Sequence, residues 1–198
     1  TGEGDLASLR DDGYSGLAAA LATEGYALRP LPSAFAREIP ADAAVVLAIA
    51  PQRALSPDAL DAVRAWLADG GRLVVFLEPD AHSGLEDVLA EWGLASPDAV
   101  VVDPASADVA GAPPGLSPIA FNYAAHPVTR GLDRNRVTFF QGARSFALRK
   151  PDVDDRLMAV VTSSGEAWLS DDPTALRGRT APARPADARA DYLPLVVA

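Results

Sequence analysis

The chain has 198 residues and carries 17 lysines and arginines against 27 aspartates and glutamates, for a formal net charge of −10. This acidity argues against nucleic acid or anionic lipid as a main partner, because phosphate binding depends on clustered positive charge. The sequence contains no cysteine, which excludes disulfides, thiolate metal sites and cysteine nucleophiles. Its length and its 49% hydrophobic content predict one well-buried domain.

A glycine-rich turn, Thr1 to Asp5, opens the chain and precedes a predicted helix. From Tyr14 to Leu21, apolar side chains recur at the i, i+3, i+4 and i+7 positions of one helix face. Gly25 follows where a left-handed residue commonly ends a helix. Residues 26–31 then predict a short strand that is terminated by prolines.

Two apolar segments predict strands that are buried on both faces of a parallel sheet. Ala43 to Ala50 and Arg72 to Leu77 are apolar without alternation, which is typical of such strands. Between them, Ser56 and Pro57 provide the N-cap and the first-turn proline of a helix. The alternation of strand and helix predicts right-handed βαβ units.

A third helix and further strands complete the predicted domain. Ser83 and Glu86 have the spacing of a capping box, and the predicted buried stripe of that helix consists of Leu85, Val88, Leu89 and Trp92. Strands are expected at 100–102, 137–148 and 157–162, the last pairing with 166–169 across the turn 163–165.

The predicted fold is therefore α/β, a three-layer αβα arrangement with a mostly parallel sheet, of the flavodoxin or class I glutamine amidotransferase type. Added strands and loops occupy the C-terminal half. We expect an α/β domain over residues 1–172, a loop or linker over 173–191, and a closing strand of the same domain over 192–198. The opening on Thr1 and the apolar close favour a fragment whose targeting or anchoring segments lie outside this sequence.

Polar residues at the predicted strand ends are the first candidates for a functional surface, because open α/β sheets bind ligands at the carboxyl ends of their strands. Glu78, Asp80 and His82 follow the second buried strand, and Pro51 follows the first. Two carboxylates and an imidazole are possible metal ligands, but acidic residues before a helix are also favoured by its dipole. We expect no metal and no cofactor.

The opening glycines lack the third glycine of a dinucleotide fingerprint and the Lys-Ser/Thr pair of a P-loop, and Glu3 would repel phosphate. The two histidines, His82 and His126, have no serine in a G-x-S-x-G elbow to accompany them. We therefore expect no catalytic residue. Glu3, Tyr123 and His126, the last at the start of a proline turn, are further candidate contact residues.

The ordered set of motifs resembles the gliding-motility-type auxiliary components of ABC transport systems, the GldG-like family. The resemblance covers residues 1–148 and the final strand, and it depends on the order and spacing of several motifs. These are TGEGD at Thr1, IP.DA.VV..IAP at Ile39, LS...L.A...WLADGGRLVVFLEP at Leu55, GL......VVD at Gly93 and HPVTRGL at His126.

This resemblance implies a non-enzymatic domain on the extracytoplasmic face of the cytoplasmic membrane, tethered through the full-length protein. Its implied partners are the ABC permease and ATPase subunits, with a second auxiliary protein as a further candidate. Two alternatives remain open at this point. One is a hydrolase or amidotransferase-like enzyme, and the other is a small-ligand or sugar sensor that uses the strand-end crevice.

Overall fold

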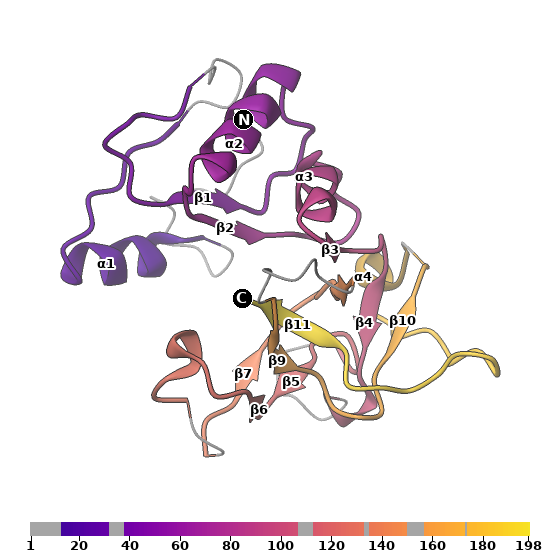
Figure 1. The fold of residues 1–198 in the computed structure, drawn as a ribbon. Helices are drawn as coiled ribbons and strands as arrows, with labels where there is room; N and C mark the ends of the chain where they lie inside the picture. The colour runs from indigo at the N-terminus through magenta and orange to yellow at the C-terminus, as the bar shows by residue number, and fades with distance from the viewer. Residues whose placement is uncertain (1–12, 32–37, 107–112, 133–134, 150–156, 173) are drawn as a thin grey trace. The chain divides into compact units, whose positions relative to one another are not determined.

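The computed structural model describes residues 13–31, 38–106, 113–132, 135–149, 157–172 and 174–198 (Figure 1). The chain divides into two compact units, and each is described by itself. Unit 1 comprises Thr1–Leu77 and Ala81–Val88, and unit 2 comprises Glu78–Asp80 and Leu89–Ala198. Within the described ranges, no helix has the length and apolar character that crossing a membrane requires. The single α/β domain over residues 1–172 and its three-layer class stay predictions.

Unit 1 contains a strand, helix, strand sequence of the predicted kind. Strands β1 and β2 pair in parallel, with Val46 opposite Leu73 and Ile49 opposite Phe76, and helix α2 connects them (Figure 1). The elements of this unit are α1 (Ser15–Thr23), β1 (Val46–Ile49), α2 (Pro57–Ala68), β2 (Leu73–Phe76) and most of α3 (Leu85–Glu91).

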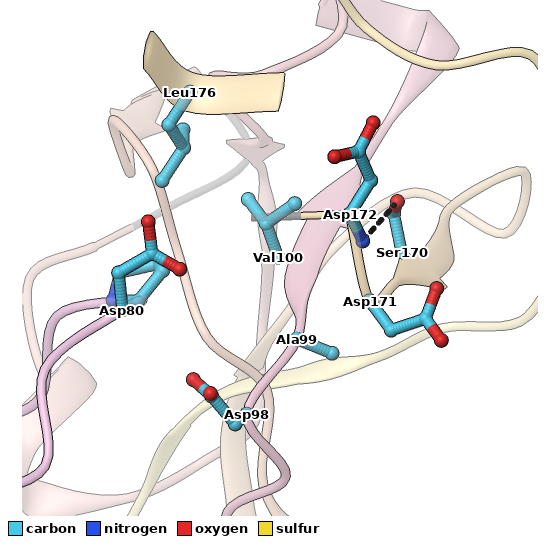
Figure 2. Close-up of a pocket in the computed structure, with 9 residues that line it drawn as sticks. Asp80, Asp98, Ala99, Val100, Ser170, Asp171, Asp172 and Leu176 are labelled. Carbon is cyan, nitrogen blue, oxygen red and sulfur yellow. Dashed lines mark hydrogen bonds between the residues drawn. The ribbon is translucent and has the colours of Figure 1, made fainter. Parts of the chain in front are cut away.

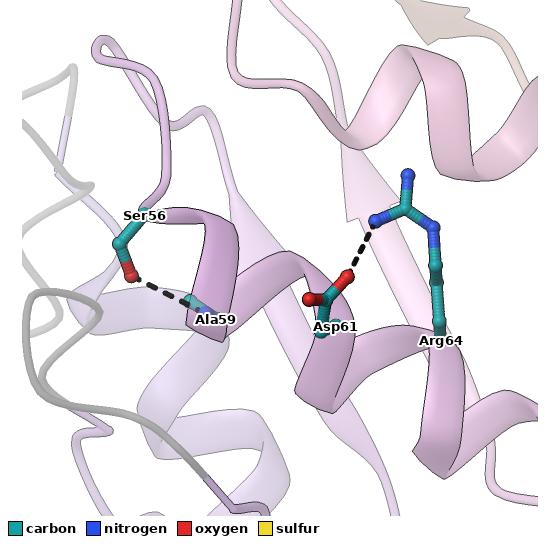
Figure 3. A network of polar contacts seen from close by, with 4 residues as sticks. All are labelled: Ser56, Ala59, Asp61 and Arg64. Carbon is teal, nitrogen blue, oxygen red and sulfur yellow. Dashed lines mark hydrogen bonds and ion pairs between the residues drawn. The ribbon is translucent and has the colours of Figure 1, made fainter.

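Helix α2 begins where the sequence predicts. The Ser56 hydroxyl accepts a hydrogen bond from the Ala59 backbone N–H at 3.2 Å, so a donor that the helix itself leaves unpaired is satisfied (Figure 3). Pro57 occupies the first turn, where its missing N–H costs nothing. On the exposed side of the helix, Arg64 donates to Asp61 at 3.0 Å.

The core of unit 1 lies on one face of the β1–β2 pair. Val63, Leu85 and Val88 are buried there, with Ala48 and Val75 packed against them. On the opposite face of β2, Val74 and Phe76 are 42% and 45% exposed. The prediction that this strand is buried on both faces is therefore wrong, because the described residues cover only one side of it.

The helix ends in unit 1 follow the predicted glycine positions. Gly25 has φ +85°, and the Tyr26 N–H donates to the Leu21 carbonyl, the six-to-one bond of a left-handed helix end. Residues 26–31 form no strand, which corrects the prediction for that segment. No other strand pairs with them in the described structure, so their extended sequence pattern has no ladder to join.

Helix α3 begins with the predicted polar contacts. The Ser83 N–H donates to Glu86 at 3.4 Å, and the Ser83 hydroxyl accepts from the Leu85 N–H at 3.2 Å. Leu85 and Val88 are fully buried, as predicted, but Trp92 is 43% exposed. Trp92 lies beyond the last helical residue, where the helical spacing no longer directs its side chain inward.

Unit 2 consists of short antiparallel ladders. Strand β9 is central to the order β11-β9-β6, while β4 pairs with β10, β3 with β8 and β5 with β7. The strands are β3 (Leu94–Ala95), β4 (Val100–Val102), β5 (Ile119–Ala120), β6 (Asn122–Tyr123), β7 (Thr138–Phe139), β8 (Ala147–Leu148), β9 (Ala159–Thr162), β10 (Trp168–Ser170) and β11 (Pro194–Val197), with η1 (Pro104–Ser106), η2 (Pro127–Thr129) and α4 (Thr174–Gly178).

Two apolar clusters stabilise unit 2. Val101, Val160 and Leu195 belong to one, and Val102 and Trp168 belong to the other. Because the side chains of a strand alternate between its faces, neighbouring residues of β4 contribute to both clusters. The predicted strands at 100–102 and at the C-terminus are confirmed as β4 and β11.

Three predictions for the C-terminal half need correction. Strands β9 and β10 do not pair across the turn 163–165, because β9 pairs with β6 and β11 while β10 pairs with β4. The predicted strand over 137–148 is divided into β7 and β8 by a turn in which Gly142 has φ +66°. The segment 173–191 contains the short helix α4 rather than loop alone.

Candidate functional site

A small acidic crevice lies within unit 2, where the Pro79–Asp80 turn approaches the ends of β4 and β10 (Figure 2). It has a volume of about 80 Å³. Its walls include four aspartates, together with the apolar side chains of Val100 and Leu176. The four are Asp80, Asp98, Asp171 and Asp172.

The aspartates of this crevice do not converge on one point. Figure 2 shows their carboxylates directed differently, with that of Asp171 turned away from Asp80. Asp80 is paired with Arg177 of α4 at 3.3 Å, and the Asp172 N–H donates to the Ser170 hydroxyl at 3.2 Å. In the part of the chain that the structure describes, no group of three or more acidic or histidine side chains has the geometry of a metal site.

Buried Arg144 fixes the backbone that forms this crevice. Only 4% of the residue is exposed, and its guanidinium donates to the Ser96 carbonyl at 2.9 Å, the Pro97 carbonyl at 3.2 Å and the Glu78 carbonyl at 3.4 Å. The planar guanidinium suits several carbonyls at once. Arg144 therefore holds the backbone just before Asp80 and just before Asp98.

Partial burial raises the pKa of the Glu78 carboxyl above its usual value, because the charged form loses hydration there. The side chain is half-buried, and Asp80 two residues later lines the crevice. Glu78 is thus the candidate acid whose environment differs most clearly from water. A raised pKa also occurs at structural positions, so this property alone assigns no chemistry.

A second polar centre is structural. Asp103 is fully buried at the end of β4, and its carboxylate accepts from the Ala105 N–H at 3.1 Å, the Ser164 hydroxyl at 2.6 Å and the Ser164 N–H at 3.1 Å. These contacts join the β4 end to the turn after β9. The sequence analysis missed this residue, although an aspartate directly after an apolar strand was a usable signal.

A shallow depression of about 360 Å³ lies beside the edge strand β6. Tyr123 lines it, and the Tyr123 hydroxyl donates to the Ala120 carbonyl at 2.8 Å. Its lining is mixed: five apolar side chains accompany the amide of Asn122 and the hydroxyls of Tyr123 and Thr162. Its walls are formed by Phe121, Asn122, Tyr123, Ala124, Leu132, Ala159, Val160 and Thr162.

His126 has a local structural contact close to this depression. The His126 Nδ1 accepts a hydrogen bond from the Val128 backbone N–H at 3.3 Å, and the His126 backbone N–H donates to the Thr129 hydroxyl at 3.2 Å. Together these two bonds cap the short helix η2. An accepting Nδ1 places the proton of the neutral imidazole on Nε2. The His126 ring thus helps to shape the turn.

The predicted site residues are distributed over different parts of the chain. Asp80 lines the acidic crevice, and Tyr123 lines the depression beside β6. Pro51 and His82 belong to unit 1, whereas Glu78 belongs to unit 2. Glu3 lies outside the described residues. The sequence analysis did not identify Asp98, Asp171 or Asp172, although the acidic pair that follows β10 was visible in the sequence.

The whole chain, residues 1–198, matches the family described as "ABC-type uncharacterized transport system". The chain belongs to this family. It is an auxiliary component of an ABC-type transport system. A search of the curated proteins found no match for this auxiliary component.

Among solved structures, the auxiliary component is similar to one described as "mmIFT52 N-terminal domain". The two share 13% sequence identity with a TM-score of 0.61, and the match covers 77% of this chain. The chain spans 66% of that protein's length. At this identity the likeness concerns the fold alone.

Proposed function

We propose that the chain is a non-enzymatic, extracytoplasmic domain that serves its ABC-type transport system by contact with protein or substrate. The observation that carries the proposal is that paired polar side chains of this chain form hydrogen bonds that stabilise its own fold. Two pairs of hydroxyl and carboxylate among the described residues, Ser164 with Asp103 and Ser83 with Glu86, each stabilise a turn or a helix start. Membership of the transport family supplies the biological setting.

The histidine contacts support the same proposal. A general base needs an imidazole nitrogen directed at a nucleophile or at substrate, but Nδ1 of His126 accepts from the backbone of its own helix start. This arrangement does not resemble a base aligned by a third residue.

The size of the acidic crevice also favours contact over small-molecule chemistry. Ligand pockets commonly enclose about 300–1,000 Å³, whereas this crevice has about 80 Å³. The enzyme and small-ligand alternatives both placed their site at the strand ends near Asp80. A protein partner, by contrast, needs no enclosed volume.

The enzyme alternative is tested by Asp80→Asn combined with His82→Gln in cells that depend on the transport system. We expect transport to continue at close to the wild-type rate, because Asp80 contributes an exposed ion pair and His82 is exposed. Arg189→Gln, at another exposed position, is the control. Loss of transport by a folded variant that still assembles with the permease and ATPase would establish chemistry at this turn.

The extracytoplasmic location is tested by a fusion to alkaline phosphatase, which is active only outside the cytoplasm. The phosphatase is joined to the C-terminal end of this domain in the full-length protein. The proposal expects an active enzyme. A fluorescent protein that folds only in the cytoplasm is the reciprocal fusion. Fluorescence of that fusion with an inactive phosphatase would refute the location while leaving membership of the transport system intact.

A further inference from the structure

The β5–β7 ladder has one buried face and one apolar outer face. Ile119 pairs with Phe139 and Ala120 with Thr138, and continuing this register brings Phe121 opposite Val137. Side chains alternate across a strand, so Ala120, which is fully buried, faces the core. Ile119, Phe121, Val137 and Phe139 lie on the other side and are named the β5–β7 face.

Three large apolar side chains of this face are exposed. Phe121, Val137 and Phe139 are 44%, 46% and 59% exposed. Single exposed apolar residues are normal, but a contiguous set of them commonly marks an interaction surface. Phe121 also lines the depression beside β6, so the face and the depression form one continuous surface within unit 2.

The local charge of this surface is opposite to that of the chain. The whole sequence has a net charge of −10, yet residues 113–132 and 135–148 contain no aspartate or glutamate. Arg136 directly precedes Val137, and Arg130 lies two residues before Leu132 of the depression; both are exposed. Between these two segments, the sequence has one negative residue, Asp133, and one positive residue, Arg134, so their charges sum to zero. The surface is therefore apolar with a basic rim.

We propose that the β5–β7 face and the depression beside β6 bind an exposed segment of the permease subunit in which an apolar or aromatic side chain is flanked by acidic residues. The depression receives the apolar side chain, and Arg130 and Arg136 contact its acidic neighbours. This inference depends on the proposed function, and it specifies which surface meets the transport system.

Concave shape and charge together favour a segment in which an apolar side chain has acidic neighbours. Interfaces concentrate their binding energy where a large side chain enters a well-packed pocket, and opposite charge at the rim steers the encounter. A lipid bilayer would present no defined side chain to fill a depression of about 360 Å³. A nucleic acid would be repelled by the net acidity of the rest of the chain.

The test places a photoreactive phenylalanine at position 121 or 139 of the full-length protein, in cells that carry a tagged permease subunit. We expect covalent adducts with the permease at both positions. The matched control is position 192, because Tyr192 of the same unit is 59% exposed but lies outside the β5–β7 face. Adduct yield at position 192 is expected to be at least about tenfold lower.

Two further variants make the result independent of the probe. The combined Phe121→Ser and Phe139→Ser variant is expected to weaken co-purification of the permease by at least about tenfold. The separate variant Arg136→Glu is also expected to reduce co-purification of the permease, and this reduction should be larger at low salt than at high salt. Circular dichroism checks that the variants are folded. Tyr192→Ser is expected to leave co-purification unchanged.

Adducts only with lipid or with a second copy of the chain, or equal yields at positions 121 and 192, would overturn the assignment. If the wild-type protein still co-purifies with the permease in those cases, the proposed function stands and only the assignment of this surface is refuted. Wild-type protein that fails to co-purify with any transport component would refute both.

Discussion

At the scale of single residues, the polar side chains that the structure buries most deeply connect segments that are far apart in sequence. Asp103 receives three hydrogen bonds from residues 105 and 164, and Arg144 donates to the carbonyls of residues 78, 96 and 97. A buried charge is tolerated only when such partners replace its lost hydration. Removing one partner leaves the others unsatisfied.

Asp103→Ala is therefore expected to lower the free energy of unfolding by about 3 kcal/mol, since the two buried donors of Ser164 would be left without an acceptor and the Ala105 N–H would lose its partner. Chemical denaturation of the purified domain measures the loss. The control is Asp171→Ala at an exposed position, where we expect a change within about 0.5 kcal/mol. Equal effects of the two variants would contradict the structural role of Asp103.

Glu78 predicts a specific pH dependence of stability. Its folded-state pKa is raised above the ordinary value of 4.5 by burial, so the folded state binds the proton more tightly than the unfolded state does. This contribution is fully present below pH 4.5 and is lost as the pH rises through the raised pKa.

The free energy of unfolding of Glu78→Gln, measured from pH 4 upward, should consequently decline less with rising pH than that of the wild type. The difference between the two proteins reports on this group, because the other carboxylates titrate in both. Parallel pH profiles would show that Glu78 is as well hydrated in the folded state as in the unfolded chain.

At the scale of elements, local signals predicted helix starts and ends better than strand pairing. The N-cap at Ser56 and the left-handed Gly25 follow from contacts within a few residues, and both are confirmed. Strand partners depend on distant segments. Residues 159–162 form a strand as expected, but they pair with β6 and β11, which no local pattern specifies.

Burial was the weakest inference at this scale. An apolar strand predicts that something covers both faces, yet Val74 and Phe76 remain substantially exposed in unit 1. Hydrophobic composition therefore indicates a preference for burial and does not supply the covering element. The candidate residue Asp80 was found because a turn after a strand is a local feature. The rest of its crevice comes from residues 98–100, 170–172 and 176, which the sequence did not place beside it.

Ser56→Ala tests the local control of helix α2. The variant loses the side-chain acceptor for the Ala59 N–H, and we expect a destabilisation of about 1 kcal/mol by thermal or chemical denaturation. Asp61→Asn is the comparison, because it removes an exposed i, i+3 ion pair of the same helix and should cost less than about 0.5 kcal/mol. A larger effect of Asp61→Asn would contradict this ranking.

At the scale of the whole molecule, membership of an ABC-type transport family and the structural use of its buried polar groups support a domain that acts by contact. Two surfaces of unit 2 differ in character: the crevice with four aspartates is small and acidic, whereas the β5–β7 face is apolar with a basic rim. If contact is the function, the two should respond differently to substitution.

The most direct measurement follows transport and permease co-purification together in cells that express the wild type, the combined Phe121→Ser and Phe139→Ser variant, and the combined Asp98→Asn, Asp171→Asn and Asp172→Asn variant. Our account predicts that transport falls in proportion to the co-purified permease, with the first variant losing both and the second retaining both. Transport that is lost by a folded variant whose complex is fully assembled would contradict it.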